Sequence, residues 1–239
     1  MAILEIKRVS KFFGGLAANS DISFDVNQGM IMGLIGPNGA GKTTLFNCIT
    51  GYYPPSRGDV IFNGKRMNGL HPDAVCKLGM VRTWQKVRPL AKMSVVDNVM
   101  VGALCRTNSL KQAREMAVEQ IKVVHLEHRA SNRAGSLPIG ERKKLEVARV
   151  LATQPRLLLL DEVMGGLNPA ESEEIIGLIL KIKKLGITQM VIEHNMKAIM
   201  RISDWIVVLN SGEKLAEGNP HEIVSNKLVI KAYLGESNA

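Results

Sequence analysis

The feature that most constrains the fold of this 239-residue chain is a glycine-rich segment between two apolar stretches. Residues 30–35 form a short apolar run typical of a buried strand, and residues 45–49 continue as a helix. The segment between them reads Gly36-Pro37-Asn38-Gly39-Ala40-Gly41-Lys42-Thr43-Thr44. It matches the phosphate-binding pattern G-x-x-x-x-G-K-S/T in the strand–loop–helix context which that pattern requires.

Each residue type in this segment suits the binding of a phosphate chain. Gly36, Gly39 and Gly41 allow positive φ angles and a close approach of the backbone to a ligand. Successive N–H groups can then surround an anion at the positive end of the following helix. Lys42 would place a cation on the β- and γ-phosphates, and the Thr43 hydroxyl would bind Mg²⁺. A chance glycine-rich turn is the alternative, but the flanking strand and helix favour a nucleoside triphosphate site.

The composition indicates an α/β protein that stays inside the cell. Apolar residues make up 46% of the chain and aromatic residues 4%, which suits a core rich in Leu, Ile and Val. Cys48, Cys76 and Cys105 lack C-x-x-C spacing and are expected to be reduced thiols. No apolar run approaches the roughly 18–20 residues of a membrane span, and the first residues lack the features of a signal peptide. We therefore expect a cytoplasmic protein.

The net charge of +9 is compatible with three kinds of partner. Nucleic acid, anionic lipid headgroups and a phosphate-rich ligand would each attract a basic protein. The basic residues are spread along the chain, and aromatic residues are not interleaved with them. This pattern gives no support to a nucleic-acid surface, and work beside an anionic membrane leaflet is at least as consistent with it.

The order of predicted strands and helices divides the chain into a mixed core and a helical insert. The opening is rich in strands, whereas residues 87–149 carry the apolar spacing of helices. We expect one domain, 1–239, in which a core made of 1–86 and 150–239 is interrupted by a helical subdomain at 87–149. The predicted strands are 4–9, 22–26, 30–35, 59–62, 80–84, 157–160, 188–192, 205–209 and 213–216. The predicted helices are 45–51, 71–78, 94–105, 110–126, 140–153, 170–185 and 195–202, followed by a helical tail.

Three details of the helical insert follow from its residues. Ser94 is predicted to cap a helix, with Asp97 three residues later as an acidic variant of the capping box. In the last helix of the insert the apolar residues are predicted to face inward and the basic ones, including Lys143, outward. His125 and His128 could share a metal, but no further ligand completes a site, which favours a solvated helix end.

A second chemical motif follows the apolar run at residues 157–160. Four consecutive leucines predict a strand buried on both faces. Asp161 and Glu162 then lie at its carboxyl end, where α/β sheets bind ligands. Asp161 would hold Mg²⁺ through its waters, and Glu162 would act as general base on the attacking water. A polar helix cap after a core strand is the alternative.

These motifs occur together, in order, with several others, and the whole resembles the ATP-binding cassette ATPases. The resemblance covers almost the entire chain, and more narrowly it is similar to the ATPase subunits of Liv-type branched-chain amino-acid importers. It implies an α/β fold: a P-loop NTPase (RecA-like) core with an antiparallel β subdomain and an inserted helical subdomain. The stretches that carry it are Phe13-Gly14-Gly15, Gly36–Thr44, Val81-Arg82-Thr83-Trp84-Gln85, Leu137–Glu141, Asp161-Glu162, Gly165–Pro169, Ile192–Met196 and Ala232–Gly235.

The resemblance implies roles for residues outside the phosphate loop. Phe13 matches the aromatic residue that stacks on adenine, although Phe12 could serve instead. Gln85 matches the residue that reaches Mg²⁺ and the attacking water, and His194 matches the one that hydrogen-bonds the γ-phosphate. Gly140 matches the signature loop, which in this family closes over the ATP of a second subunit. Work by this chain should therefore require a head-to-tail dimer.

Three positions depart from the commonest pattern of the family. The second signature residue is Pro138 where Ser is usual, so a hydroxyl and an N–H donor are both missing. Gly140 and the helix N-terminus remain, and one hydrogen bond to a charged group contributes about 1.5–3 kcal/mol. We therefore expect weaker closure on ATP but an active enzyme. Val163 replaces the usual Pro, and Asn168 the usual Asp.

The resemblance implies an ATP- and Mg²⁺-dependent ATPase that drives import of small solutes, most simply branched-chain or related amino acids. Its expected partners are a second cassette, identical or not, two membrane permeases and a separate solute-binding protein. It would work at the inner face of the plasma membrane. One alternative is a cassette that acts on nucleic acid or the ribosome, but the chain lacks the long coiled coil or tandem cassette usual there. Another is a regulatory subunit that hydrolyses ATP weakly because of Pro138.

Overall fold

The computed structural model describes residues 1–234 of the chain. They form two compact units, one made of Met1–Val75 with the chain from Thr188 onward, the other of Cys76–Ile187. The first unit contains an antiparallel sheet in the order β2-β1-β4-β5. Its strands are β1 (Ala2–Phe13), β2 (Leu16–Asn27), β4 (Arg57–Phe62) and β5 (Lys65–Arg66).

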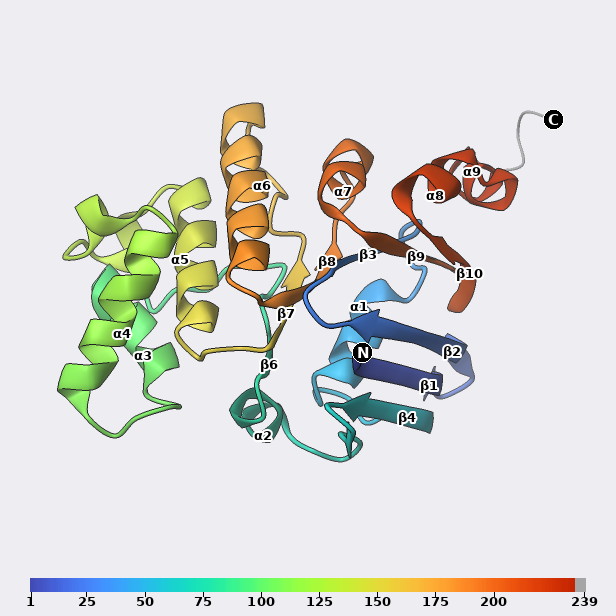
Figure 1. Cartoon of the computed structure of the whole chain (residues 1–239), viewed down its shortest axis with the longest axis horizontal. Coiled ribbons are helices and arrows are strands. Elements are labelled where there is room, and N and C mark those ends of the chain that lie inside the picture. Colours follow the sequence, from blue (N-terminus) through green and yellow to red (C-terminus); the bar gives the residue numbers. More distant parts are fainter. Residues whose placement is uncertain (235–239) are drawn as a thin grey trace. The chain divides into compact units, whose positions relative to one another are not determined.

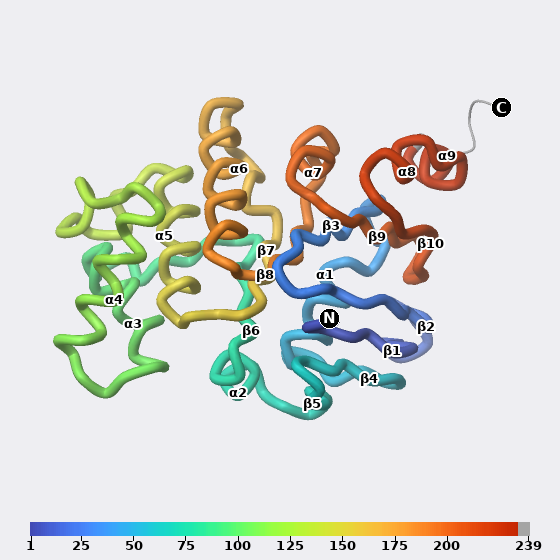
Figure 2. The backbone as a smooth tube through the Cα atoms, in the orientation of Figure 1, coloured from blue at the N-terminus to red at the C-terminus, as the bar shows by residue number. Residues whose placement is uncertain are grey.

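The hairpin of β1 and β2 is longer than the sequence pattern indicates (Figure 2). Leu4 and Ile6 alternate with more exposed residues, as expected for a strand with one buried face. The two strands stay paired, with several register shifts along the way, as far as the Gly14-Gly15 turn, where Phe13 pairs with Leu16. The predicted strands 4–9 and 22–26 were therefore too short, because the turn end of the hairpin is mostly exposed and pairs through the backbone without a buried face.

The second set of strands in this unit lies in the order β10-β9-β3-β8. The central strand β3 (Ile31–Ile35) is parallel to β8 (Thr188–Ile192) and to β9 (Trp205–Asn210), and all its residues are buried. β10 (Glu213–Gly218) forms an antiparallel hairpin with β9. The parallel arrangement brings the carboxyl ends of β3 and β8 to one edge of the sheet. The helices of this unit are α1 (Lys42–Ile49), α7 (Met196–Ile202), α8 (Pro220–Ser225) and α9 (Lys227–Leu234).

The other unit combines a parallel strand pair with a group of helices. β6 (Met80–Arg82) runs parallel to β7 (Leu157–Asp161), and every residue of both strands is buried. Figure 1 shows α3, α4 and α5 lying side by side in this unit. Its helices are α3 (Val95–Ala103), α4 (Leu110–Val123), α5 (Ile139–Leu151) and α6 (Pro169–Lys184), with short 3₁₀ turns at Glu127–Arg129 and Ala134–Ser136. The chain passes from the first unit to this one within α2 (Pro72–Lys77).

Local sequence signals account for the helix ends in this unit. The Asp97 N–H donates to Ser94 Oγ at 3.1 Å, which confirms the predicted cap of α3. The predicted helix at 110–126 ends earlier, at Val123, because His125 adopts a left-handed conformation with φ of 57°. α3 and α5 approach so closely at Gly102 that a Cβ there would lie 2.1 Å from the Arg149 carbonyl oxygen. Only glycine fits this contact.

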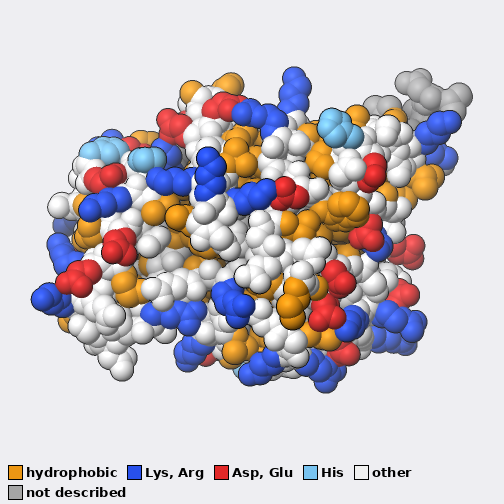
Figure 3. Space-filling model, viewed as in Figure 1, with side chains coloured by type: hydrophobic (Ala, Val, Ile, Leu, Met, Phe, Trp, Pro, Cys, Tyr) orange, Lys and Arg blue, Asp and Glu red, His pale blue; other side chains and the backbone are white. Residues whose placement is uncertain are grey.

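The surface and the polar side chains bear on whether the protein could span a membrane, bind nucleic acid or hold a metal. No helix within residues 1–234 is long and apolar enough to cross a bilayer. On the face drawn in Figure 3, Lys and Arg side chains alternate with Asp and Glu rather than forming one basic patch. Within the described residues no three acidic, His or Cys side chains are grouped to hold a metal. His128 instead contacts Glu141 at 3.3 Å, and His125 lies 3.4 Å from Lys181 Nζ. All three cysteines are free thiols.

Candidate nucleotide site

The glycine-rich segment forms a tight loop between β3 and α1, and its glycines are required by contacts with neighbouring backbone. Gly36 has φ of 151°, and a Cβ there would lie 2.1 Å from the Leu209 carbonyl oxygen. Gly41 has φ of 94°, and a Cβ would lie 2.4 Å from the Ala18 carbonyl oxygen. No other residue type fits these two positions without moving β2 or β9. The loop is therefore held at both ends by the sheets beside it.

Lys42 opens α1 with its side chain folded over the loop. Its Nζ donates to the carbonyl oxygens of Gly36 at 2.7 Å and Pro37 at 2.9 Å, and the residue is buried. Asn19 on β2 supports the same loop, because its fully buried side chain donates to the Gly41 carbonyl oxygen at 3.1 Å. Asn19 was not predicted to support the loop, since a polar residue within a strand gives no sign of a partner 22 positions later.

His194 follows β8 at the same edge of the sheet as the loop. Leu34 of β3 is paired in parallel with Ile192 of β8, so both strands end at similar height. His194 is exposed there, and the next residue, Asn195, caps α7 by accepting the Ala198 N–H at 3.1 Å. The fold thus brings the predicted histidine to the sheet edge that carries the phosphate loop.

The two candidate adenine-stacking residues lie in different surroundings at the end of β1. Phe13 is 42% exposed and meets the Tyr53 ring edge-on, with centroids 5.3 Å apart. Lys11 Nζ lies 5.1 Å from the centroid of Phe13. Phe12 instead contacts the Arg57 guanidinium, 5.6 Å from its centroid. Both rings are partly exposed, so the preference for Phe13 stays a prediction from the resemblance.

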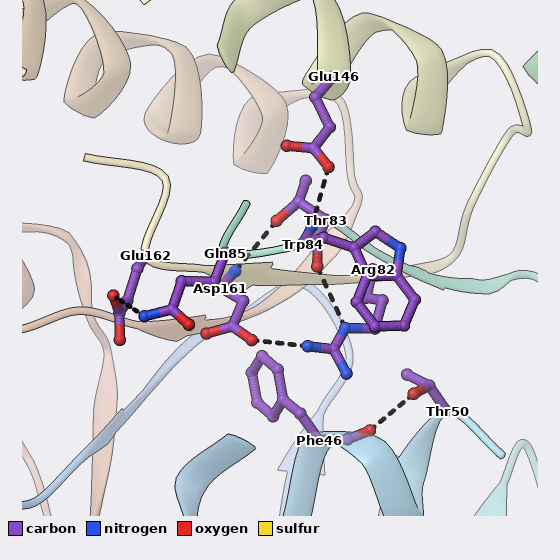
Figure 4. Close-up of polar contacts among 9 residues, drawn as sticks. All are labelled: Phe46, Thr50, Arg82, Thr83, Trp84, Gln85, Glu146, Asp161 and Glu162. Atoms are coloured by element: carbon purple, nitrogen blue, oxygen red, sulfur yellow. Dashed lines mark hydrogen bonds and ion pairs between the residues drawn. The ribbon is translucent and has the colours of Figure 1, made fainter. Parts of the chain in front are cut away.

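In the other unit the predicted acidic residues lie together at the ends of β6 and β7 (Figure 4). Asp161 is buried, and its Oδ2 accepts a hydrogen bond from Arg82 Nη2 at 2.6 Å. Glu162 is partly exposed, and its Oε2 accepts from Gln85 Nε2 at 2.7 Å. The structure therefore brings together Gln85, Asp161 and Glu162, three residues predicted to act on the same water and metal.

Glu162 has a strained backbone that its neighbours support. Its φ is 50°, an uncommon value for a residue with a side chain. Its carbonyl oxygen accepts from Lys143 Nζ at 2.7 Å and from the Gly165 N–H at 3.1 Å. Strained conformations of this kind persist where the surroundings fix them, and they concentrate at functional sites.

The prediction that Lys143 faces outward is wrong. Lys143 is 4% exposed and spans from α5 to the backbone of Glu162. Apolar periodicity misassigns such a residue, because a lysine can bury its aliphatic stem and still satisfy its ammonium group at a carbonyl oxygen. Lys143 is therefore a supporting residue of the site that the sequence pattern did not indicate.

The signature segment begins α5. Pro138 is the N-cap and offers no side-chain hydrogen bond to the helix. A Cβ at Gly140 would lie 2.7 Å from Glu171 Oε1, so the glycine allows α5 and the start of α6 to meet. Glu171 belongs to a capping box with Asn168, which accepts the Glu171 N–H at 2.9 Å. Asn in place of the usual Asp thus keeps the cap of α6.

The predicted metal ligands have the chemistry that Mg²⁺ prefers. Asp161 offers a carboxylate, Thr43 a hydroxyl and Gln85 an amide oxygen, and Mg²⁺ binds hard oxygen donors together with waters and phosphates. The buried Asp161 carboxylate forms an ion pair with Arg82. This donor set fits magnesium.

Comparison with known proteins decides the family. Residues 19–165 match the family described as ABC transporter, and residues 213–239 match that described as branched-chain amino acid ATP-binding cassette transporter. The chain belongs to the ATP-binding cassette family of transporters. It is 40% identical, over 98% of each chain, to the high-affinity branched-chain amino acid transport ATP-binding protein BraF of Pseudomonas aeruginosa. This confirms the resemblance inferred from the motifs.

Solved cassettes share the fold. The ADP conformation of MJ1267, an ATP-binding cassette of an ABC transporter, superposes with a TM-score of 0.89 at 32% identity and covers 99% of this chain and 100% of its own. The dimeric structure of MJ0796, a bacterial ABC transporter cassette, gives a TM-score of 0.82 at 25% identity, with 91% and 98% covered. The α/β fold predicted from the sequence is confirmed. The chain is thus an ATPase cassette that binds nucleotide.

Restoring serine at Pro138 is expected to hold or raise the ATPase rate. The substitution returns a hydroxyl and an N–H to the start of α5, and each hydrogen bond to a phosphate contributes about 1.5–3 kcal/mol. The measurement is kcat and KM for ATP of P138S beside the unmodified cassette. A collapse of turnover in a folded P138S protein would show that the signature segment has been misplaced.

Proposed function

We propose that this cassette drives the import of branched-chain or related small amino acids by hydrolysing ATP. The observation that carries this proposal is the match of residues 213–239 to the branched-chain cassette family, together with identity to BraF over nearly the whole chain. The tail supports a transporter subgroup, whereas the motif residues support only the ATPase chemistry.

In this proposal the chain's residues divide the work on ATP. Phe13 stacks on adenine, the loop N–H groups and Lys42 bind the phosphates, and His194 hydrogen-bonds the γ-phosphate. Glu162 accepts the proton of the attacking water, and Gln85, already hydrogen-bonded to Glu162, orients that water. Mg²⁺ held by Thr43, Asp161 and Gln85 would neutralise developing charge on the phosphate oxygens.

The proposal includes three kinds of protein partner. A second cassette, the same or a sister chain, would pair head to tail so that the partner subunit's Gly140 closes over this chain's ATP; the dimeric MJ0796 structure supports such pairing in the family. Two permease subunits would hold the cassette at the inner face of the membrane, and a solute-binding protein would deliver the amino acid. Closure on ATP and opening after hydrolysis would pass through the Gln85 segment to the permeases.

The test is transport in proteoliposomes that contain the cassette, its permease pair and the binding protein. Labelled leucine is expected to accumulate only with ATP and Mg²⁺, and E162Q cassettes are expected to give none. Genes for a binding protein and two permeases beside the cassette gene would supply the components. ATPase activity stimulated by nucleic acid, with no response to permeases, would overturn the proposal in favour of a non-transport cassette.

A further inference from the structure

A buried arginine that the proposed chemistry does not use contacts the predicted magnesium carboxylate. Arg82 is the last residue of β6, and its Nη2 lies 2.6 Å from Asp161 Oδ2. The two side chains are only 5% and 0% exposed. A buried charge requires a partner. Removing one member of such a pair leaves the other charge buried in a medium of low dielectric constant, which destabilises the fold. The carboxylate is thus held from one side by a fixed cation.

The residues that follow Arg82 contact both Asp161 and its neighbour Glu162. The hydroxyl of Thr83 accepts the Asp161 N–H at 3.0 Å, and Arg82 Nε donates to the Thr83 carbonyl oxygen at 3.1 Å. Gln85 bonds to Glu162, as described above. The short segment 82–85 therefore contacts the side chain and backbone of Asp161 and the side chain of Glu162 (Figure 4).

The same segment is tied to the signature helix through Trp84. The Arg82 guanidinium lies 4.3 Å from the centroid of the Trp84 ring, within the range of a cation–π contact. The backbone N–H of Trp84 donates to Glu146 Oε1 at 3.0 Å. Glu146 is buried on α5, the helix that carries Gly140 near its start. A continuous line of contacts thus runs from α5 to Asp161.

The electrostatics of Glu146 agree with this line. Burial raises the pKa of Glu146, while the Trp84 N–H and the charges of Arg149, Lys143 and Arg82 act in the opposite direction. Arg82 therefore lies in the field of two buried carboxyl groups, one on α5 and one at the end of β7.

We infer that Arg82 is a positioning residue, which holds Asp161 in place for Mg²⁺ and links it through Trp84 and Glu146 to the signature helix. A carboxylate has two oxygens that accept several hydrogen bonds, so one bond from Arg82 to Oδ2 is compatible with a metal-bound water on the other oxygen. The inference rests on the proposed role of Asp161 as a magnesium residue. It adds that the state of α5 and the state of the metal site are coupled within one chain.

The test measures how much Mg²⁺ strengthens nucleotide binding, not only the rate of hydrolysis. The affinity of the purified cassette for a fluorescent ATP analogue is measured once with Mg²⁺ and once with EDTA. The ratio of these two affinities is the gain from Mg²⁺. In R82Q, the gain from Mg²⁺ is expected to fall about tenfold, the effect of one lost charge-assisted bond, while the affinity in EDTA stays within about twofold. R82K keeps the charge but loses the planar guanidinium that donates to both Asp161 and Thr83. Its gain from Mg²⁺ is expected to lie between those of R82Q and the unmodified cassette.

Controls separate the inference from loss of folding and from failure of the proposed function. R8Q removes the exposed Arg8–Asp21 pair and is expected to keep the full gain. D161N is expected to abolish the gain; a wild-type cassette without any gain would refute the role of Asp161 itself. An unchanged gain in folded R82Q and R82K proteins would overturn the inference alone. If R82Q does not fold, as judged by thermal unfolding, R82K decides the result.

A double-mutant cycle tests the link to α5. E146A removes the acceptor of the Trp84 N–H and is expected to reduce the gain from Mg²⁺ about threefold in the wild-type background. In the R82Q background it is expected to add nothing, because the path to Asp161 is already broken. Independent effects that multiply in the double variant would refute the link between Glu146 and Asp161.

Discussion

Replacing Glu162 by glutamine is expected to stop ATP turnover almost completely while ATP binding continues. The substitution keeps the size of the side chain but removes the base, and a positioned general base contributes about 10²–10⁴-fold to rate. The hydrogen bond to Gln85 can survive, since an amide carbonyl accepts the Gln85 Nε2 donor as the carboxylate does. The strained backbone at φ of 50° is supported by Lys143 and Gly165, which the change does not touch.

The measurement combines three assays on E162Q. Phosphate release gives turnover, a fluorescent nucleotide gives affinity, and size-exclusion chromatography with ATP shows whether a dimer is trapped. E115Q is the matched control, because Glu115 is an exposed acid on α4 in the same unit and the chemical change is identical. Turnover in E162Q equal to that of E115Q would remove Glu162 from the role of base.

The parts of the fold that were predicted from the sequence are those determined by residues close together in the chain. The leucines of β7 predicted a fully buried strand, and all of its residues are buried. The cap of α3 at Ser94 was confirmed because its partner lies only three residues away. The turn from β3 into α1 was predicted for the same reason, since the pattern that indicates it lies within nine consecutive residues.

The parts that were missed depend on polar contacts between distant positions. Arg82 meets Asp161 across 79 positions, and Lys143 reaches the backbone of Glu162 across 19. Neither contact leaves a periodic trace, and each residue on its own reads as a surface charge. The motif stretch at 81–85 was recognised for Gln85, but nothing in it distinguished Arg82 as the partner of a carboxylate. Burial of charged groups is visible only once the strands are placed.

Replacing Lys42 by alanine is expected to weaken ATP binding by about 100-fold or more. The loop N–H groups can still surround a phosphate, but the only cation within the loop is removed. Lys42 Nζ makes two short bonds, to the Gly36 and Pro37 carbonyl oxygens, which hold the side chain over the loop. A hydrogen bond to a charged group contributes about 1.5–3 kcal/mol, and two such bonds to phosphate oxygens account for the expected loss.

The control for this prediction is K65A, which removes an exposed lysine on β5 of the same unit and is expected to bind ATP normally. Thermal unfolding of K42A separates loss of the phosphate cation from loss of the loop, because Asn19 and the glycine contacts still hold the loop when the lysine is gone. ATP is expected to raise the midpoint of K65A, since a ligand stabilises the state that binds it, but not that of K42A at the same concentration. If ATP stabilised both variants equally, the triphosphate would have to bind elsewhere in the chain. The assignment of the glycine-rich loop as the phosphate site would then be wrong.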